Sequence, residues 1–185
     1  MTQKFHDLVA DARSYRRFDQ SKKMTMQELE ELAELGRITP CGGNRQYIRF
    51  ALCADEEKNE EIYKNLAWAG YLSDWDGPVE GERPTGYILI LRDLSLQKNL
   101  TVDEGIVAQT IFLGARDMGY GGCMLMNIKR TELMEIFGLD PEKDAISMVI
   151  ALGVPVEEVK MVEVKDDDIK YYRDENQVHY VPKRS

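Results

Sequence analysis

The sequence predicts one α+β domain with four or five strands, a buried central helix and a long C-terminal arm. Three observations support this prediction. Helical and strand-like apolar patterns alternate along the chain, and one long helical pattern is apolar on more than one face. Residues 160–185, by contrast, are charged and only weakly periodic. A chain of 185 residues is long enough for one domain with its own core, so we take residues 1–185 as a single domain.

Five segments have helical patterns. Thr25 with Glu28 and Thr101 with Glu104 are capping boxes, in which a threonine and a glutamate three residues later satisfy each other's backbone N–H groups. The second box begins the long buried helix, and Gly138 follows the last helical pattern. The predicted helices are residues 4–11, 25–37, 56–67, 101–119 and 131–137.

Short apolar runs predict strands at residues 48–54, 87–91, 123–125 and 147–152. Residues 68–84 differ, because they contain both tryptophans together with glycines and prolines and have little periodicity. An irregular segment of this length inside a compact domain is usually functional or disordered. Its aromatic residues favour a lid or a binding loop.

The charge balance is acidic, with 24 lysines and arginines against 33 aspartates and glutamates and a net charge of -9. This balance argues against nucleic acid or an anionic membrane as the main partner. No run approaches the roughly 20 apolar residues that span a bilayer. The N-terminus is too polar for a secretory signal, so we expect a cytoplasmic protein.

The three cysteines, Cys41, Cys53 and Cys123, are widely spaced and form no CxxC pair. The two histidines, His6 and His179, lie near opposite ends of the sequence. This pattern predicts no metal site and fits a reducing compartment. We expect Cys53 and Cys123 to be buried structural thiols.

A dense basic cluster stands near the start of this acidic chain, at Arg13-Ser14-Tyr15-Arg16-Arg17. Guanidinium groups bind phosphate oxygens through paired hydrogen bonds, and a serine hydroxyl can add another donor. The cluster therefore suggests a site for a phosphorylated small molecule. The alternative is a solvated basic face paired with Asp7, Asp11 and Asp19, since surface ion pairs are common.

Two glycine-rich segments are further candidates. Residues 40–46 (Pro-Cys-Gly-Gly-Asn-Arg-Gln) form either a plain turn or a polar loop that a flat ligand can approach closely. Residues 119–127 follow a helix and begin a strand, the reverse of a Rossmann fingerprint. They are either a glycine-terminated helix end or a strand whose backbone amides face a ligand.

Taken together, these segments resemble the nitroreductase family of flavin oxidoreductases. Residues 13–18 are similar to its Arg-Ser-x-Arg signature, and residues 40–46 to its Pro-Ser-x-x-Asn-x-Gln loop. Residues 103–121 resemble its central helix and Gly-Leu-Gly turn, residues 150–155 its late strand and turn, and Lys183-Arg184 its C-terminal basic pair. The matches follow the family's order over nearly the whole chain.

The resemblance implies a nitroreductase-like fold: a central, mostly antiparallel sheet flanked by helices, with residues 160–185 extending onto the partner in a homodimer. It implies two FMN sites at the subunit interface, with Arg13, Ser14 and Arg16 holding the phosphate and ribityl chain. The other implied cofactor-binding residues are Pro40, Cys41, Gly42 and Asn44 of the other subunit, Leu125 and Met126 near the flavin N5 edge, and Lys183 and Arg184 on the phosphate or pyrimidine side. The sequence departs from the family at Ala12, often an arginine, and at Cys41, usually a serine.

The implied activity is ping-pong hydride transfer from NADH or NADPH through FMN to a nitroaromatic, quinone or similar acceptor. No catalytic side chain is required, which fits a sequence without a His/Cys or Ser/His constellation. Two alternatives stay open: a specialised flavin enzyme of the same fold (a reductive dehalogenase or a flavin-fragmenting enzyme), and a non-catalytic flavin-binding or storage protein. Trp68, Tyr71 and Trp75 are candidates for a substrate lid, or else aromatic plugs in the dimer core.

Overall fold

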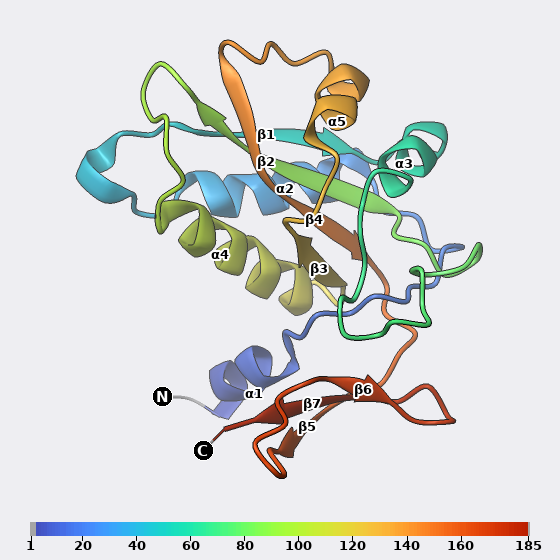
Figure 1. Cartoon of the computed structure of the whole chain (residues 1–185). Helices are drawn as coiled ribbons and strands as arrows, with labels where there is room; N and C mark the ends of the chain where they lie inside the picture. The colour runs from blue at the N-terminus through green and yellow to red at the C-terminus, as the bar shows by residue number, and fades with distance from the viewer. Residues whose placement is uncertain (1–2, 185) are drawn as a thin grey trace.

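The computed structural model describes residues 3–184, in which a four-stranded sheet lies between two layers of helices (Figure 1). Its strand order is β1-β2-β4-β3, and every neighbouring pair is antiparallel. The helices are α1 (Gln3–Asp11), α2 (Met26–Arg37), η1 (Gly42–Asn44, one 3₁₀ turn), α3 (Glu56–Tyr63), α4 (Asp103–Asp117) and α5 (Arg130–Phe137). The strands are β1 (Ile48–Cys53), β2 (Gly86–Asp93), β3 (Gly121–Leu125), β4 (Asp144–Gly153), β5 (Val159–Glu163), β6 (Tyr172–Arg173) and β7 (His179–Lys183). The predicted α+β class with an antiparallel central sheet is confirmed.

Both faces of the central sheet are buried, which explains why its strands are almost continuously apolar in the sequence. Helices α2 and α4 pack on one face, where they meet alternate residues such as Ile88, Ile90 and Ile150. Helices α3 and α5 contact each other, and Ile62 and Leu133 pack on the other face together with Leu89. The long helix α4 buries one face, through residues such as Val107 and Ile111. Ile106 is 42% exposed on the opposite side, so the prediction that this helix is buried on more than one face is wrong for the single chain.

The helix boundaries follow the capping signals, except that α4 begins two residues after the threonine of its predicted capping box. Both hydrogen bonds of the Thr25–Glu28 capping box are present, and Gly138 ends α5 with a left-handed φ of 62°. Thr101 donates its N–H to Glu104, although regular helix begins only at Asp103. Helix α3 ends at Tyr63, earlier than predicted, because the following residues hydrogen-bond to residues 127–129 instead.

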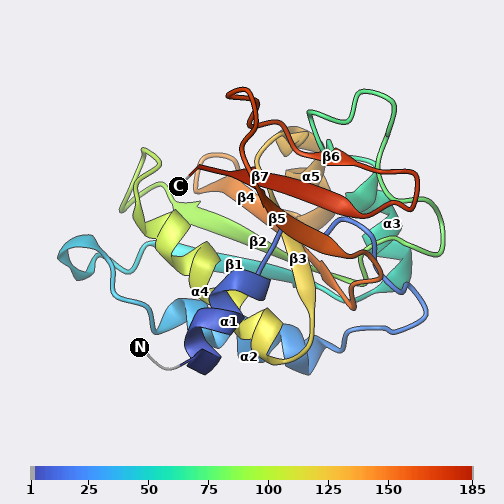
Figure 2. The ribbon, with the colours of Figure 1, turned by 90° about the horizontal axis from the view of Figure 1, so that it is seen from below.

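The C-terminal segment forms a small sheet of its own, in the order β5-β7-β6. Strand β5 is parallel to β7, and β6 is antiparallel to β7. This sheet lies beside α1 and below the central sheet (Figures 1 and 2). Its strands are two to five residues long and few of their side chains are buried, so the sequence pattern is weak. Extension of this segment onto a partner, and the assignment of one domain, stay predictions.

Cys53 and Cys123 are buried free thiols, as expected. Burial raises the pKa of both thiols. Within residues 3–184, no helix has the length and apolar character needed to cross a membrane, and no group of metal-ligating side chains is found.

Candidate functional site

Residues 12–18 form an extended segment that lies along the outer edge of β3. Ser14 bridges to Gly122 in parallel, and Tyr15 donates its N–H to the Gly122 carbonyl at 2.8 Å. A Cβ added at Gly121 would come within 2.6 Å of the Tyr15 ring, so this close approach requires glycine. The backbone of the basic cluster is thereby fixed beside the predicted ligand-facing strand.

The three arginines of this segment have different surroundings. Arg17 forms a bidentate ion pair with Glu82, at 2.7 and 2.6 Å, so its role is structural. The Arg13 guanidinium lies 3.1 Å from the sulfur of Met161 on β5, and Ser14 is exposed. Arg16, in contrast, is only 8% exposed.

Two of the acidic residues considered as partners for the arginines pair elsewhere. Asp11 binds Arg116 at 2.6 Å, and Asp19 lies 3.5 Å from Lys22. The surface ion-pair interpretation therefore describes Arg17, with Glu82 as its partner, rather than Arg16.

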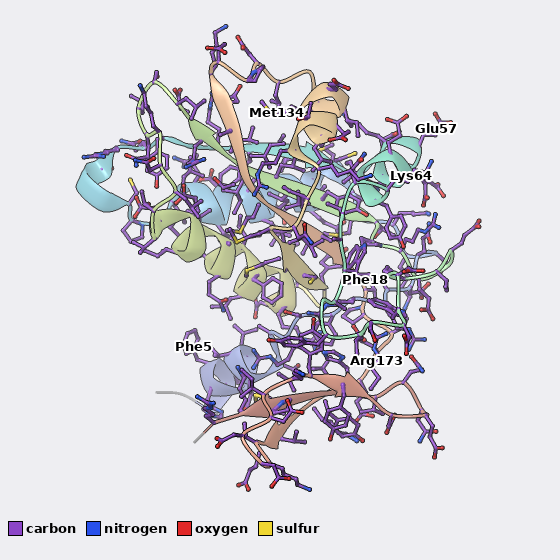
Figure 3. The ribbon with its side chains drawn as sticks, in the orientation of Figure 1. Phe5, Phe18, Glu57, Lys64, Met134 and Arg173 are labelled. Atoms are coloured by element: carbon purple, nitrogen blue, oxygen red, sulfur yellow. The ribbon has the colours of Figure 1, made fainter. Side chains whose placement is uncertain are left out.

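Arg16 belongs to a buried group that we call the Glu157 cluster: Arg16, Glu157, Arg173 and His179. The Glu157 carboxylate accepts the backbone N–H of Arg16 and, at 2.8 Å, Nη2 of Arg173. Nε2 of His179 lies 3.3 Å from Nη1 of Arg16, so Nε2 is the acceptor and Nδ1 carries the hydrogen. The side chains of Arg173 and Glu157 are 6% and 0% exposed. Figure 3 shows Arg173 where the C-terminal sheet meets the rest of the molecule.

The hydrogen-bonding capacity of the Glu157 cluster is only partly satisfied, although Nη1 of Arg16 also donates to the Ser14 carbonyl at 3.3 Å. Four of its buried nitrogen atoms have no hydrogen-bond partner among residues 3–184: Nε of Arg16, Nε and Nη1 of Arg173, and Nδ1 of His179. Burial, followed by the two guanidinium charges, lowers the pKa of His179 to about 4, so the imidazole is neutral near pH 7. The cluster thus contains two guanidinium groups and one carboxylate, and only the Arg173 guanidinium binds that carboxylate directly. Buried donors without acceptors are costly, so the cluster fits an anion with several acceptor oxygens.

The irregular segment 68–84 reaches the same place. The Trp75 ring lies 4.2 Å from the Arg173 guanidinium, and the Tyr171 ring lies 4.8 Å from that of Arg16. Tyr71, whose residue surface is 52% exposed, packs against Tyr171 at a ring-centre distance of 4.9 Å. Trp68 is instead buried in the core of the domain. Tyr71 and Trp75 therefore adjoin the Glu157 cluster or its Tyr171 cover, whereas the Trp68 ring packs beside Tyr63 at a ring-centre distance of 6.0 Å.

The segment that follows α2 forms a second polar site. Gly43, Asn44 and Gln46 have left-handed φ values of 60°, 52° and 50°. The N–H of Gly42 donates to both carboxylate oxygens of Asp103, at 3.2 and 3.1 Å. Cys41 Sγ accepts the N–H of Gln46 at 3.4 Å.

Asp103 connects this loop to the core. It is buried at the start of α4, and Tyr47 donates its hydroxyl to the carboxylate at 3.2 Å. Burial raises the pKa of Tyr47 to about 12, so this hydroxyl stays a donor. A groove of about 360 Å³ lies beside the loop and is lined in part by Pro40, Cys41 and Asn44.

The remaining predicted site residues lie at two other positions. Leu125 is buried at the end of β3, and the next residue, Met126, is 49% exposed and its carbonyl accepts Nη2 of Arg130 at 3.3 Å. Lys183 ends β7, paired with Glu163 of β5. Lys183 and Arg184 are exposed and line a hollow of about 420 Å³ together with Glu163 and Asp167.

The structure thus brings together some of the predicted residues and separates others. The 13–17 segment, β3, the 68–84 loop and the C-terminal sheet meet in one region. The 40–44 loop lies at the opposite end of the central sheet in both Figures 1 and 2. Sequence reasoning missed Glu157, Arg173 and His179, as well as the Asp103 and Tyr47 anchor of the 40–44 loop. The only available signal was the position of Arg173 and His179 among the tyrosines of the C-terminal segment.

The nitroreductase family model matches residues 9–154, and the chain belongs to this family. It is 22% identical over 193 residues to a Bacillus subtilis (strain 168) protein named "Putative NAD(P)H nitroreductase YdgI", with 85% of this chain and 91% of that protein covered. Solved structures with the same fold include an Exiguobacterium sibiricum 255-15 protein in complex with FMN (19% identity, TM-score 0.69, 94% and 99% coverage). Another is an FMN-dependent nitroreductase from Clostridium difficile R20291 (18% identity, TM-score 0.66, 86% and 91% coverage). The nitroreductase-like fold is confirmed.

Proposed function

We propose that this chain is an FMN-dependent oxidoreductase that transfers hydride from NADH or NADPH to a nitroaromatic, quinone or similar acceptor. The observation that carries the proposal is the unsatisfied, net cationic cluster around Arg16, beside Ser14 and strand β3. An FMN phosphate would supply the charge and acceptors that this cluster lacks. Membership of the nitroreductase family and the FMN named in related structures support the same cofactor.

The residues of this chain would bind and orient the cofactor. Arg13, Ser14 and Arg16 would hold the phosphate and ribityl chain, and the backbone at Leu125 and Met126 would border the N5 edge. Lys183 and Arg184 would approach the phosphate or the pyrimidine side. Bound FMN would supply reversible hydride transfer, so no side-chain acid or nucleophile is needed. Tyr71 and Trp75, from the loop that contains Trp68, would shield the substrate side from water.

The site would be completed in a homodimer. Pro40, Cys41, Gly42 and Asn44 belong to a loop at the opposite end of the central sheet from the region where the 13–17 segment meets the C-terminal sheet, so one subunit does not bring both sets together. Contribution of the 40–44 loop by the partner would resolve this separation. We expect the single-domain chain to work in the cytoplasm, and its three free cysteines fit that setting.

Anaerobic mixing of the FMN-reconstituted protein with NADH and, separately, with NADPH tests this function. Either donor should bleach the oxidised-flavin absorbance band near ~450 nm, and a nitroaromatic or quinone should then restore it. A protein that retains FMN but bleaches with neither donor would be a flavin-binding or storage protein. A colourless protein that cannot be reconstituted with FMN would contradict the proposal altogether.

A further inference from the structure

The Glu157 cluster draws its cations from two distant parts of the chain. Arg16 comes from the segment after α1, whereas Arg173 and His179 come from the C-terminal sheet. Arg173 pairs with His179 across β6 and β7, so the two side chains lie on the same face of that sheet. That face is turned toward Arg16, because Nε2 of His179 contacts the Arg16 guanidinium.

One carboxylate does not satisfy this arrangement. Both oxygens of Glu157 are already used, one by the Arg16 backbone and one by Nη2 of Arg173. Four buried nitrogen atoms of Arg16, Arg173 and His179 remain without partners among residues 3–184. The cluster therefore has more positive charge and more donors than a single carboxylate can match.

We propose that Arg173 and His179 act with Arg16 as a phosphate-monoester site, and that the Glu157 carboxylate occupies this site as an internal competitor. The proposal rests on the proposed function in taking the phosphate to be that of FMN. A phosphate monoester carries about -1.5 to -2 charges near pH 7 and three strong acceptor oxygens, which matches two guanidinium groups and an imidazole N–H. The phosphate site thereby extends beyond Arg13, Ser14 and Arg16 into the C-terminal sheet.

The C-terminal sheet then has a part in ligand binding. Tyr171 stacks over Arg16 and donates no charge, so it covers the guanidinium without neutralising it. Tyr171 also accepts the backbone N–H of Tyr71 at 3.3 Å, which connects the sheet to the 68–84 loop. Binding of phosphate between Arg16 and Arg173 would hold the 13–17 segment, the 68–84 loop and the C-terminal sheet together.

The experiment compares FMN with riboflavin, which lacks the phosphate, by fluorescence titration of the apoprotein. Arg173→Met should weaken FMN binding about tenfold or more and leave riboflavin binding within about threefold. Glu157→Gln should strengthen FMN binding about threefold or more, because the competing negative charge is lost. The matched controls are Arg49→Met and Asp144→Asn, the two members of an ion pair between β1 and β4 to which the candidate site does not extend. Both controls should change FMN binding by less than about threefold.

Unchanged FMN affinity in Arg173→Met, or weakened FMN affinity in Glu157→Gln, would overturn the proposal. If Arg173→Met does not fold, Arg173→Lys is the substitute, because lysine keeps the positive charge but lacks the paired N–H donors of a guanidinium. This variant should still weaken FMN binding about threefold. Unchanged affinity in that variant would also overturn it.

A second measurement separates this proposal from the proposed function. Inorganic phosphate, compared with chloride at equal ionic strength, should raise the melting temperature of wild type more than that of Arg173→Met. That result without FMN binding would support the anion site and contradict the flavin function. If the protein binds FMN and its affinity is unchanged in Arg173→Met and Glu157→Gln, the flavin function is supported and the anion site is overturned.

Discussion

The candidate site has two parts, the 40–44 loop and the Glu157 cluster, and each contains a buried carboxylate. The surroundings of these carboxylates, Asp103 and Glu157, differ. Asp103 accepts hydrogen bonds from neutral groups, the N–H of Gly42 and the hydroxyl of Tyr47. Glu157 lies between two arginines whose donors it does not exhaust. Asp103 therefore fixes a loop, whereas Glu157 is the counter-charge of an incomplete anion site. A buried acid alone does not mark a ligand site; the balance of donors and charge around it does.

The largest expected effect comes from removing the cations at the Glu157 end. Arg13→Ala with Arg16→Ala should weaken FMN binding about 100-fold or more, because two charge-assisted contacts to the phosphate are lost. The measurement is FMN content of the purified protein and titration of the apoprotein. Arg49→Ala, which removes an arginine paired with Asp144, is the control. Unchanged FMN content in the double variant would show that the basic cluster does not bind the FMN phosphate.

The second effect is pH dependence, which should be present at the Glu157 end alone. Burial and, in the same direction, the charges of Arg16 and Arg173 lower the pKa of His179 from 6.5 to about 4 on folding. The unfolded chain therefore binds a proton that the folded chain does not, and stability falls as pH drops from about 6.5 toward 4. Urea unfolding of the apoprotein should show a loss of about 3 kcal/mol over this range relative to His179→Gln. Parallel pH profiles of the two proteins would contradict the buried neutral imidazole.

The third effect concerns the Asp103 end. Asp103→Ala leaves the Gly42 N–H and the Tyr47 hydroxyl without this acceptor, and should cost about 1–3 kcal/mol of unfolding free energy. Amide exchange should accelerate in residues 41–46 while that of β3 is unchanged. Asp117→Ala, at the exposed end of the same helix, is the control. A variant as stable as wild type, with unchanged exchange, would show that Asp103 does not fix the loop.

The smallest effect is expected for Cys41→Ser, which restores the residue usual in the family. Serine can accept the same N–H of Gln46, so stability should change by less than about 0.5 kcal/mol. FMN affinity should be equal to that of wild type or up to about threefold tighter. A tenfold weaker affinity would mean that the sulfur itself has a packing role in the loop.

Local chemistry allowed much of the fold to be predicted. The Thr25–Glu28 box and the left-handed Gly138 depend on neighbours within one turn, and both were found where the sequence indicates. The end of α3 was wrong because pairing with residues 127–129 overrides the local helical pattern. The C-terminal sheet was missed because its short strands bury few side chains.

In the candidate site, too, the residues set by local sequence were predicted and those brought together by tertiary structure were not. Arg13, Ser14 and Arg16 form a motif that is visible within four residues, and the structure places them on one extended segment beside β3. Glu157, Arg173 and His179 lie between residues 157 and 179 and meet Arg16 only through tertiary structure. No spacing rule connects residues that come from the C-terminal sheet, the turn before that sheet and the segment after α1.

Amide hydrogen exchange with and without FMN tests most directly whether the two ends of the chain form one flavin site. We predict slower exchange on FMN addition in residues 13–18 and 41–46 together, with residues 139–143 unchanged. That last segment lies in the loop between α5 and β4, away from η1 and from the C-terminal sheet (Figure 1), and lines part of the roughly 600 Å³ hollow beside Arg49 and Asp93. Protection of residues 139–143, with residues 13–18 and 41–46 unaffected, would contradict the proposed site.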